Sequence, residues 1–424
     1  MGVGRTLVRG AVVRLTDADP ARLWRSPLRG PWLTSVLGLL LLGAVAVIAT
    51  TGFLSHAAYE PRLGGNAIVP PGRDLPVLDG GWPTAPAWLY ALTQGLHVNV
   101  GLAAIPLLLA KLWSVIPRLF VWPPARSPAQ AVERLGIAVL VGSGLFEFAT
   151  GVCNAQNWYP FGFNFVVAHY YGAVAFVAAL VVHVAVKMPV LARALGTRRA
   201  LAPLRASLAE TRPEPPDPDG LVPVRPAAPT LTRRGLLALT GAGSLLLLAL
   251  NAGQSVGGPL RRLSLLAPRR AAGFPVNKTA AAAGIDPART GRGWRLAVAG
   301  PGGERTFSRD ALLALEQHAE ELPIACVEGW STLQRWSGVR LADLAALAGA
   351  PAAGSVEVGS LQKAGVLRRA TLSGAQLADP RSLLALRVNG ADLSLDHGFP
   401  ARVIVPGAPG VHCTKWVSSL TFRA

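Results

Sequence analysis

Cysteine is scarce in this chain of 424 residues, which contains only Cys153, Cys326 and Cys413. Small disulfide-stapled folds carry a paired cysteine framework, so three cysteines exclude that way of holding the protein together. The odd number leaves at least one thiol for chemistry.

Acidic residues are also few, because 23 Asp and Glu stand against 41 Lys and Arg, for a formal net charge of +18. In a soluble protein such an excess suggests a nucleic-acid partner. Here the basic residues lie beside long apolar runs, so membrane topology explains the charge and no nucleic-acid partner is expected. The hydrophobic content of 51% excludes a disordered chain and indicates a membrane protein with a soluble part.

Five apolar runs are long enough, or nearly so, to cross a bilayer as helices. They cover residues 32–55, 87–110, 135–152, 163–186 and 235–250. A cleavable amino-terminal signal is not evident, so the first run is expected to remain as an anchor.

Lys and Arg are unevenly distributed between these runs. The basic clusters are Arg5, Arg9, Arg14, Arg22, Arg25 and Arg29, then Lys111, Arg118, Arg126 and Arg134, then residues 187–234. The alternate loops hold only Arg62 and Arg73. The positive-inside rule therefore predicts a multi-pass protein of the plasma membrane. Its amino terminus would be cytoplasmic, and everything after Leu250 would be external.

The pattern changes beyond residue 259 to that of a water-soluble domain. Short β runs are expected at residues 294–298, 355–359 and 402–405, and amphipathic helices at 308–319 and 341–347. Strands and helices without regular βαβ alternation predict an α+β fold, placed after an all-α module of five spans.

We therefore expect five segments along the chain. One boundary falls at a Pro-rich stretch, residues 212–220, which is typical of an extended linker. The five segments are a basic cytoplasmic amino terminus (1–31), a four-helix transmembrane module (32–190), a cytoplasmic Pro/Arg-rich linker (191–234), a fifth transmembrane helix (235–250) and an external domain (273–424).

Two motifs in the external domain bear on its chemistry. One is Cys326-Val-Glu-Gly-Trp-Ser, reached through the apolar Pro323-Ile-Ala, which is typical of a strand ending at a pocket. The other is Asp396-His-Gly-Phe-Pro-Ala-Arg-Val-Ile-Val-Pro, followed by Gly410-Val-His-Cys-Thr-Lys-Trp-Val. As a pair, they resemble the sulfite-oxidase-type molybdopterin domain, in which one cysteine thiolate ligates molybdenum.

That resemblance implies that Cys326 is the molybdenum ligand and the catalytic residue, since soft thiolates suit such a metal. Trp330 and Trp336 are expected to wall the site. The alternative is a buried inert thiol, which is the more common state of a lone cysteine. Cys413 is expected to be structural, because a disulfide to Cys326 would quench the ligand.

The resemblance also implies a set of groups for the pterin and its phosphate, as arginine binds phosphate bidentately and lysine as a point charge. The candidates are Asn277, Ser360, His397, Arg402, Thr414 and Lys415. His397 departs from the asparagine of the methionine-sulfoxide-reductase branch but keeps a ring donor or acceptor. The alternative for Arg402 and Lys415 is the usual solvated strand-face charge.

Two departures from true sulfite oxidases concern the substrate. The substrate-binding arginines of those enzymes have no match here, and no immunoglobulin-like dimerisation domain follows Ala424 in this sequence. The resemblance therefore does not imply sulfite as the substrate.

Immediately after the linker, Leu231-Thr-Arg-Arg-Gly-Leu-Leu precedes a Gly-interrupted apolar stretch. It resembles a twin-arginine export signal placed internally. Alternatively, Arg233 and Arg234 anchor the topology as ordinary charges. Export is favoured because a cofactor assembled in the cytoplasm must cross with its protein already folded.

Four histidines fall in or beside the first four spans: His56, His97, His169 and His183. Their spacing resembles that of haem b membrane cytochromes and favours one haem between His97 and His169. The alternative is a set of packing histidines in a helical anchor. Glu147 either handles protons or quinol or lies at the outer interface.

These patterns predict a membrane-anchored molybdopterin-dependent oxidoreductase that transfers an oxygen atom on a small substrate outside the membrane and exchanges electrons with the membrane module. Its partners would be the lipid bilayer and a quinone or redox protein. The main alternative is a membrane electron-transfer cytochrome with a non-catalytic external binding domain. A structural or export-related membrane protein would have neither metal nor haem.

Overall fold

The computed structural model describes residues 24–59, 82–119, 125, 127–196, 200–217, 220–269, 273–365 and 368–423. Several arginines used for the predicted topology lie outside these residues, namely Arg5, Arg9, Arg14, Arg22, Arg62, Arg73, Arg126, Arg198 and Arg199.

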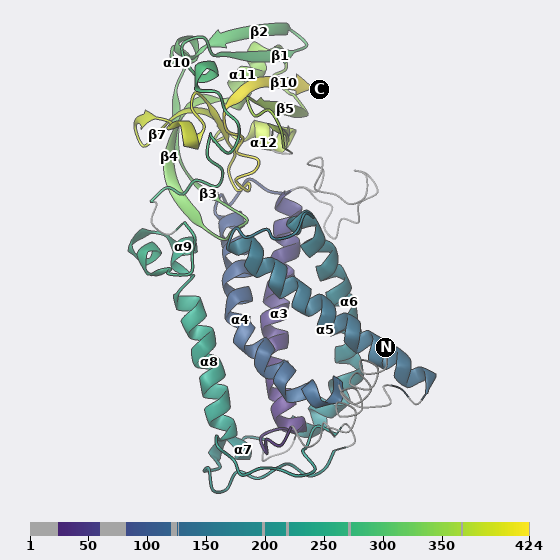
Figure 1. Cartoon of the computed structure of the whole chain (residues 1–424). Coiled ribbons are helices and arrows are strands. Elements are labelled where there is room, and N and C mark those ends of the chain that lie inside the picture. Colours follow the sequence, from purple (N-terminus) through teal and green to yellow (C-terminus); the bar gives the residue numbers. More distant parts are fainter. Residues whose placement is uncertain are drawn as a thin grey trace, which may run out of the picture. The chain divides into compact units, whose positions relative to one another are not determined.

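Five helices among the described residues are long and apolar enough to cross a membrane, as predicted (Figure 1). They are α3 (Pro31–Tyr59), α4 (Leu89–Leu119), α5 (Pro128–Ala155), α6 (Phe165–Leu195) and α8 (Arg233–Ala249). Each helix extends beyond its predicted apolar segment at one end or at both, because polar residues continue it. Helix α5 begins at Pro128, where the Ser127 hydroxyl accepts a hydrogen bond from the Gln130 N–H at 3.2 Å, as expected of an N-cap before proline.

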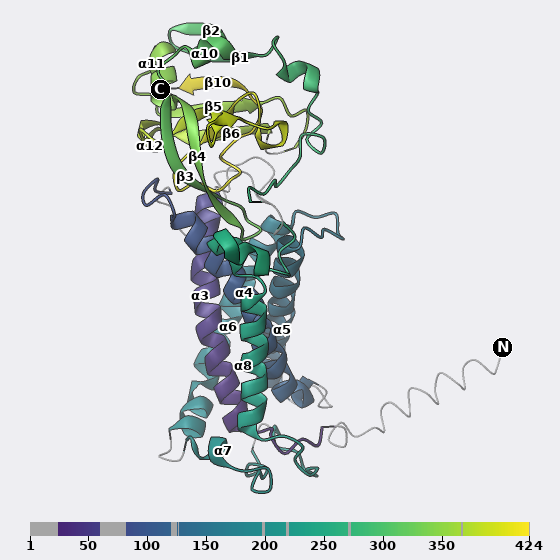
Figure 2. The same ribbon diagram turned by 90° about the vertical axis from the view of Figure 1, so that its left-hand side faces the viewer.

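The carboxyl-terminal part is the expected α+β fold and contains two sheets. In the first sheet the strand order is β2 (Gly303–Ser308), β1 (Arg295–Gly300), β10 (Val417–Arg423), β5 (Ser355–Ser360) and β6 (Arg369–Ser373) (Figure 2). Strands β1 and β10 are parallel and the other pairs antiparallel. Alternate residues such as Leu296, Val298, Val356 and Val358 are buried, as the two-residue period of a strand requires.

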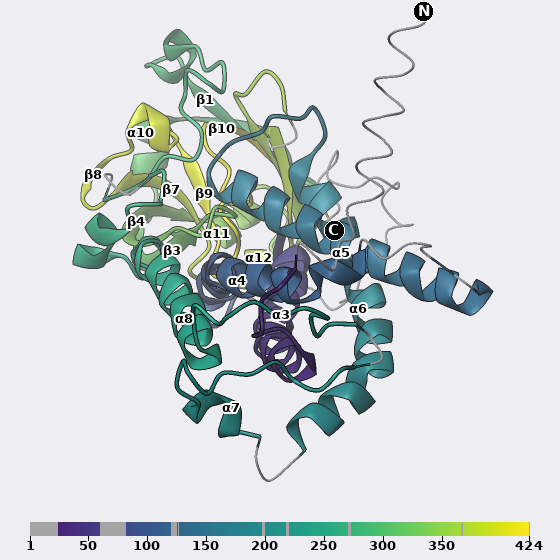
Figure 3. The same ribbon diagram turned by 60° about the horizontal axis from the view of Figure 1, so that its bottom comes forward.

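The second sheet is antiparallel, in the order β3 (His318–Ala325), β4 (Ser331–Arg340), β7 (Leu383–Val388) and β8 (Ala391–Asp392), with β9 (Arg402–Ile404) also paired to β7 (Figure 3). The β3–β4 hairpin closes with Ala325 opposite Ser331. Its tip therefore begins at Cys326. The short helical elements are α7 (Ala202–Arg205), α9 (Gly253–Val256), η1 (Gly258–Leu263), η2 (Pro287–Thr290), α10 (Arg309–Leu313), α11 (Leu341–Leu347), α12 (Gly374–Ala378) and η4 (Leu395–His397).

The predicted helix at 341–347 is confirmed as α11, whereas the predicted helix at 308–319 is wrong. Only α10 forms there, capped by the Ser308 hydroxyl, which accepts from the Ala311 N–H at 3.1 Å. From His318 onward the chain pairs with β4 and buries Leu322 and Ile324 on one face. Long-range strand pairing thus overrides the local helical pattern.

Contacts divide the chain into two compact units. The first comprises Met1–Ala46, Leu102–Phe148 and Gly172–Leu247, and the second Val47–Gly101, Ala149–Tyr171 and Leu248–Ala424. The second unit thus combines one end of each of helices α3 to α6 with the strand-rich part.

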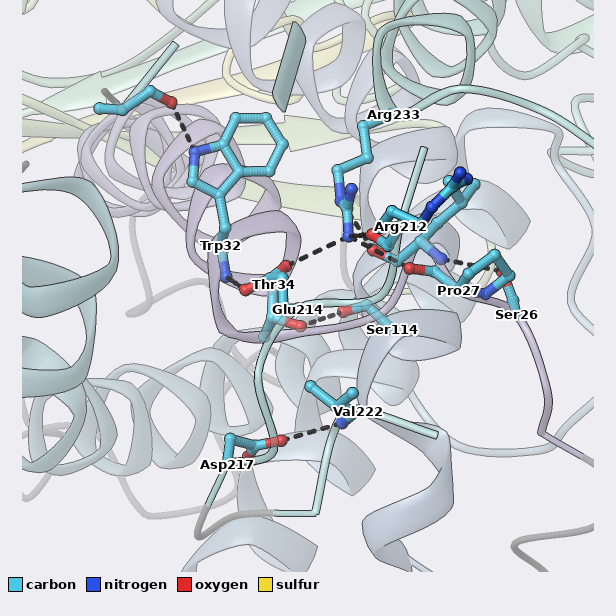
Figure 4. Close-up of polar contacts among 12 residues, drawn as sticks. Ser26, Pro27, Trp32, Thr34, Ser114, Arg212, Glu214, Asp217, Val222 and Arg233 are labelled. Atoms are coloured by element: carbon cyan, nitrogen blue, oxygen red, sulfur yellow. Dashed lines mark hydrogen bonds and ion pairs between the residues drawn. The ribbon is translucent and has the colours of Figure 1, made fainter. Parts of the chain in front are cut away.

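In the first unit, the described Pro-rich residues 212–217 form no helix or strand but are tied to the start of α3 (Figure 4). A Glu214 carboxylate oxygen accepts from the Trp32 N–H at 2.9 Å and so caps the helix. Gly30 permits this approach, because an added Cβ would lie 2.4 Å from the Glu214 carboxyl carbon. The Ala227 N–H also donates to the Arg25 carbonyl at 2.8 Å.

Arg233 completes this cluster (Figure 4). Its guanidinium donates to the carbonyls of Pro27, Leu28 and Arg212 at 3.1–3.3 Å and lies 3.8 Å from a Glu214 carboxylate oxygen. Arg234, the other half of the arginine pair, is exposed. The two arginines therefore have different structural roles in the folded protein.

Candidate functional site

Cys326 stands directly after β3, at the tip of the β3–β4 hairpin. Its N–H donates to the Trp330 carbonyl at 3.0 Å, and its carbonyl accepts from the Gly329 N–H at 2.9 Å. Gly329 has a φ of +92°, which a glycine adopts without strain. The apolar approach through residues 323–325 therefore ends a strand at Cys326, as the sequence indicated.

Burial raises the pKa of the Cys326 thiol, and the neighbouring Glu328 carboxylate raises it further. The main-chain N–H groups of Glu328 and Val327 and the Arg269 guanidinium act in the opposite direction. By itself this thiol would stay protonated at neutral pH. A bound metal ion would remove the proton, because coordinated thiols are deprotonated outright. This setting suits a metal ligand better than a free nucleophile.

The apolar wall behind the thiol contains Trp330 and Trp336, both buried, with Cys326 and Phe274 packed against the same cluster. Cys413 belongs to this cluster too and is buried and free. Burial raises the pKa of its thiol. Its environment is that of a small apolar residue.

Arg402 and Lys415 are buried, at 4% and 8% exposure. The Arg402 guanidinium donates to the carbonyls of Cys413 and His397 at 3.2 and 3.3 Å, and Lys415 Nζ donates to the carbonyls of Lys278 and Asp396. Among the described residues, neither cation has a carboxylate within 4 Å.

Burial lowers the pKa of Arg402 to about 10. Burial, and then repulsion from Arg402, lowers the pKa of Lys415 to about 7. Two buried positive charges without an anion are costly, and an anionic ligand would remove that cost. The interpretation of these residues as solvated strand-face charges does not hold.

Further polar groups surround these cations. The Thr414 hydroxyl is buried and has no hydrogen-bond partner among the described residues. His397 stacks on Phe274 with ring centres 3.7 Å apart, and its Nδ1 lies 2.8 Å from the Ser394 hydroxyl. The Ser360 hydroxyl donates to the Lys415 carbonyl at 2.8 Å. The structure thus brings five of the six predicted cofactor residues together.

The sixth, Asn277, is linked instead to the Cys326 side, because its carbonyl accepts from Arg269 at 2.9 Å. Arg269 also pairs with Glu328 at 2.7 Å. Neither Arg269 nor Glu328 is among the site residues predicted from the sequence. Glu328 stands inside the cysteine motif and could have been found there, whereas Arg269, 57 positions before Cys326, has no local signal.

Helix ends within the same unit hold the two predicted haem ligands. The rings of His97 and His169 are perpendicular, with centres 6.0 Å apart. His97 Nδ1 lies 2.9 Å from the Ile48 carbonyl, and His169 Nδ1 lies 2.8 Å from the Thr150 hydroxyl. His56 instead stacks on Tyr170 at 3.5 Å. The structure therefore brings together the predicted pair and not the other histidines of this unit.

Comparison with known proteins agrees with the motifs. Residues 283–424 match the family described as the oxidoreductase molybdopterin binding domain. Sulfite oxidase of Arabidopsis thaliana is 36% identical over 103 residues, which are 21% of this chain and 26% of that protein. Mitochondrial sulfite oxidase of Rattus norvegicus is 33% identical over 159 residues, which are 31% and 29% of the two chains.

Among solved structures, the sulfane dehydrogenase SoxCD from Paracoccus pantotrophus shares 23% identity, with 31% of this chain and 38% of that chain covered and a TM-score of 0.29. The chain spans less than a third of the length of the two sulfite oxidases.

Proposed function

Because residues 283–424 are a molybdopterin-binding oxidoreductase domain of the sulfite-oxidase type, we propose that the protein is a membrane-anchored enzyme that transfers an oxygen atom to or from a small substrate. The observation that carries this proposal is the buried pair Arg402 and Lys415, which has no carboxylate within 4 Å among the described residues, in one compact unit with Cys326.

The residues present fit the molybdenum cofactor. Arg402, Lys415 and the Thr414 hydroxyl, which has no hydrogen-bond partner in the described part of the chain, would hold its phosphate and pterin, and the thiolate of Cys326 would ligate the metal. His397 is fixed by its stacking on Phe274 and would contact the pterin edge. The bound cofactor supplies two-electron oxygen-atom chemistry, while the protein orients it and excludes water through Trp330 and Trp336.

Membrane placement supports an external site. The five apolar helices suggest a multi-pass membrane protein. With Lys and Arg concentrated in alternate loops, the strand-rich part would lie outside the plasma membrane. The pair Arg233 and Arg234 would act as the export signal. Since Arg233 is buried in the folded cluster, a receptor would have to read the pair before that cluster assembles.

A second function, electron transfer by haem b, is favoured by the histidine pair. A metal–imidazole bond is about 2 Å long, so two imidazoles on one metal ion place their ring centres about 6 Å apart. The observed separation is 6.0 Å. Both Nδ1 atoms already face oxygen atoms, so each Nε2 would be the ligand, as is usual for metal-bound histidine.

Gly52 lets helix α3 lie against the His97 ring, because an added Cβ there would lie 2.8 Å from it. At Gly101, one turn beyond His97 on α4, an added Cβ would meet nothing within 4 Å, so there is open space beside this part of the helix. Electrons would pass between this haem and a quinone or a redox protein.

Metal analysis of the purified full-length protein, together with its visible spectrum, tests both functions. We expect about one molybdenum per chain and a b-type spectrum that is lost in both His97→Ala and His169→Ala. Haem without molybdenum would favour the alternative of a cytochrome with a non-catalytic external domain. Molybdenum without haem would leave the helices as an anchor.

A further inference from the structure

The loop that carries Cys326 is attached to helix α4. The Gln94 side-chain N–H donates to the Val327 carbonyl at 2.7 Å, and Gln94 is 7% exposed. This bond joins residues 233 positions apart in the chain. A buried amide that donates to a carbonyl beside the proposed metal ligand fixes the loop against the helix.

A second attachment lies at the other end of the loop. The Gly329 carbonyl accepts from the Ser255 hydroxyl at 2.6 Å, and that hydroxyl accepts from the Asn99 side chain at 2.8 Å. Asn99 in turn accepts from Asn251 at 2.7 Å. Asn99 and Ser255 each accept one of these hydrogen bonds and donate the next, so the three bonds can form at the same time.

Close packing reinforces both attachments. A Cβ at Gly329 would lie 2.9 Å from Val98 Cβ, so only glycine lets the loop approach α4 this closely. Tyr90, on the same helix, is 2% exposed, packs with Ala325 and lies near enough to Cys326 for an electrostatic interaction. The end of α4 therefore contacts the loop from Ala325 to Gly329.

The same face of α4 carries a proposed haem ligand. Tyr90, Gln94 and His97 stand at positions i, i+4 and i+7, which share one face of a helix. Seven residues advance the helix by about 10.5 Å. One rigid element therefore holds both the cysteine loop and His97.

We propose that α4 couples the molybdenum centre to the haem, with Gln94 and Ser255 as positioning residues that hold the cysteine loop against the helix for electron transfer. This inference rests on the proposed function. Adding one oxygen atom from water to a substrate releases two electrons and two protons, and the reverse reduction consumes the same number. A haem held by His97 and His169 would pass the electrons singly, and a membrane quinone would accept the pair with two protons, or a quinol would supply them.

The test uses the full-length protein loaded with both cofactors, carrying Gln94→Leu or Ser255→Ala. Turnover with a soluble viologen dye reports the molybdenum site alone, whereas the rate at which substrate changes the haem spectrum reports transfer between the centres. We expect each variant to keep its molybdenum content, haem midpoint potential and dye turnover within about twofold, while the haem rate falls about tenfold or more.

A matched control is Thr93→Val, on the same turn of α4. The Thr93 hydroxyl is buried but donates to the Tyr90 carbonyl of its own helix at 3.2 Å, so its loss should leave the haem rate unchanged. As a readout without turnover, amide hydrogen exchange at residues 326–329 of cofactor-free protein should quicken in Gln94→Leu and not in Thr93→Val.

The outcomes separate the two proposals. Wild-type protein without molybdenum would overturn the proposed enzyme, and wild-type protein without haem would overturn only its second function, electron transfer by haem; either result would overturn the coupling with it. Wild-type protein with both cofactors, and variants with undiminished haem rates, would overturn the coupling alone. Variants that lose molybdenum or shift the haem potential would show that the attachment only maintains the fold, which also overturns the coupling.

Discussion

Arg233 and Arg402 are equally buried, at 4% exposure each, yet their surroundings differ. Arg233, in the first unit, donates to three carbonyls and has the Glu214 carboxylate at 3.8 Å. Arg402, in the second unit, donates to two carbonyls, has no carboxylate partner among the described residues and lies near the cationic Lys415.

The difference distinguishes a structural cation from a ligand-binding one. A guanidinium whose charge is already balanced stabilises the fold, and its removal leaves buried groups without partners. A buried guanidinium without an anion is a cost that the protein sustains until a negative ligand arrives. Replacing Arg402 should therefore impair function more than stability, whereas replacing Arg233 should impair stability more than function.

The largest effect is expected from Cys326→Ser. Serine is nearly the same size but is a harder, poorer donor for molybdenum, so oxygen-atom transfer should fall below detection while most of the cofactor stays bound. Oxygen-atom transfer with an oxyanion or a sulfoxide should be measured together with the electron paramagnetic resonance signal of the molybdenum. Wild-type activity with an unaltered signal would mean that Cys326 is not the ligand.

Arg402→Met should lower the cofactor content about 10- to 100-fold, with activity falling in proportion. The cofactor-free variant should be at least as stable as cofactor-free wild type, because an uncompensated buried charge has been removed. Molybdenum analysis and thermal unfolding check the two parts. Arg335→Met, at an exposed site on β4, is the control and should change neither. A destabilised variant with normal cofactor content would show that Arg402 has the structural role and does not bind the cofactor.

Arg233→Met should have the opposite profile. It leaves the partly buried Glu214 carboxylate without its cation and three carbonyls without a donor, at a cost of about 3–5 kcal/mol. Thermal unfolding in detergent should show the loss, whereas the molybdenum content of the folded fraction should stay at the wild-type value. An unchanged unfolding temperature would refute the structural role assigned to Arg233.

A pH titration sharpens the comparison at Lys415. The unfolded chain keeps the lysine proton up to its ordinary pKa of 10.5, whereas the folded cofactor-free protein loses it near pH 7. The unfolded state binds more protons between these values, so stability should rise with pH there, by at most about 1.4 kcal/mol per unit. Lys415→Met should flatten this slope, and so should bound cofactor. Identical slopes in all three forms would contradict the assignment.

The smallest effect on stability is expected from Arg234→Lys, within about 0.5 kcal/mol, because Arg234 is exposed. If the pair is an export signal, the variant should nevertheless keep the carboxyl-terminal domain in the cytoplasm, protected from protease added to intact cells. Full external display of a stable variant would show that the pair only anchors topology.

Much of the architecture follows from local sequence. Apolar runs of membrane length predict helices because a single apolar segment can pair its own backbone groups within a bilayer only as a helix, and all five are present among the described residues. Helix α11 and strands β1, β5 and β9 follow from their local periodicity. The position of Cys326 at the end of a strand is also predictable, from the apolar residues 323–325 before it and the polar turn after it.

Tertiary structure decided what depends on residues far apart in the chain. Strand β3 begins at His318, within the last two residues of the predicted helix 308–319, because its pairing energy comes from β4. Whether Arg402 is a surface charge or a buried one depends on the elements that cover it, and Gln94 meets Val327 only through the fold. Local periodicity records which face of an element is apolar, but the partner that covers that face is chosen by the packing of the whole chain.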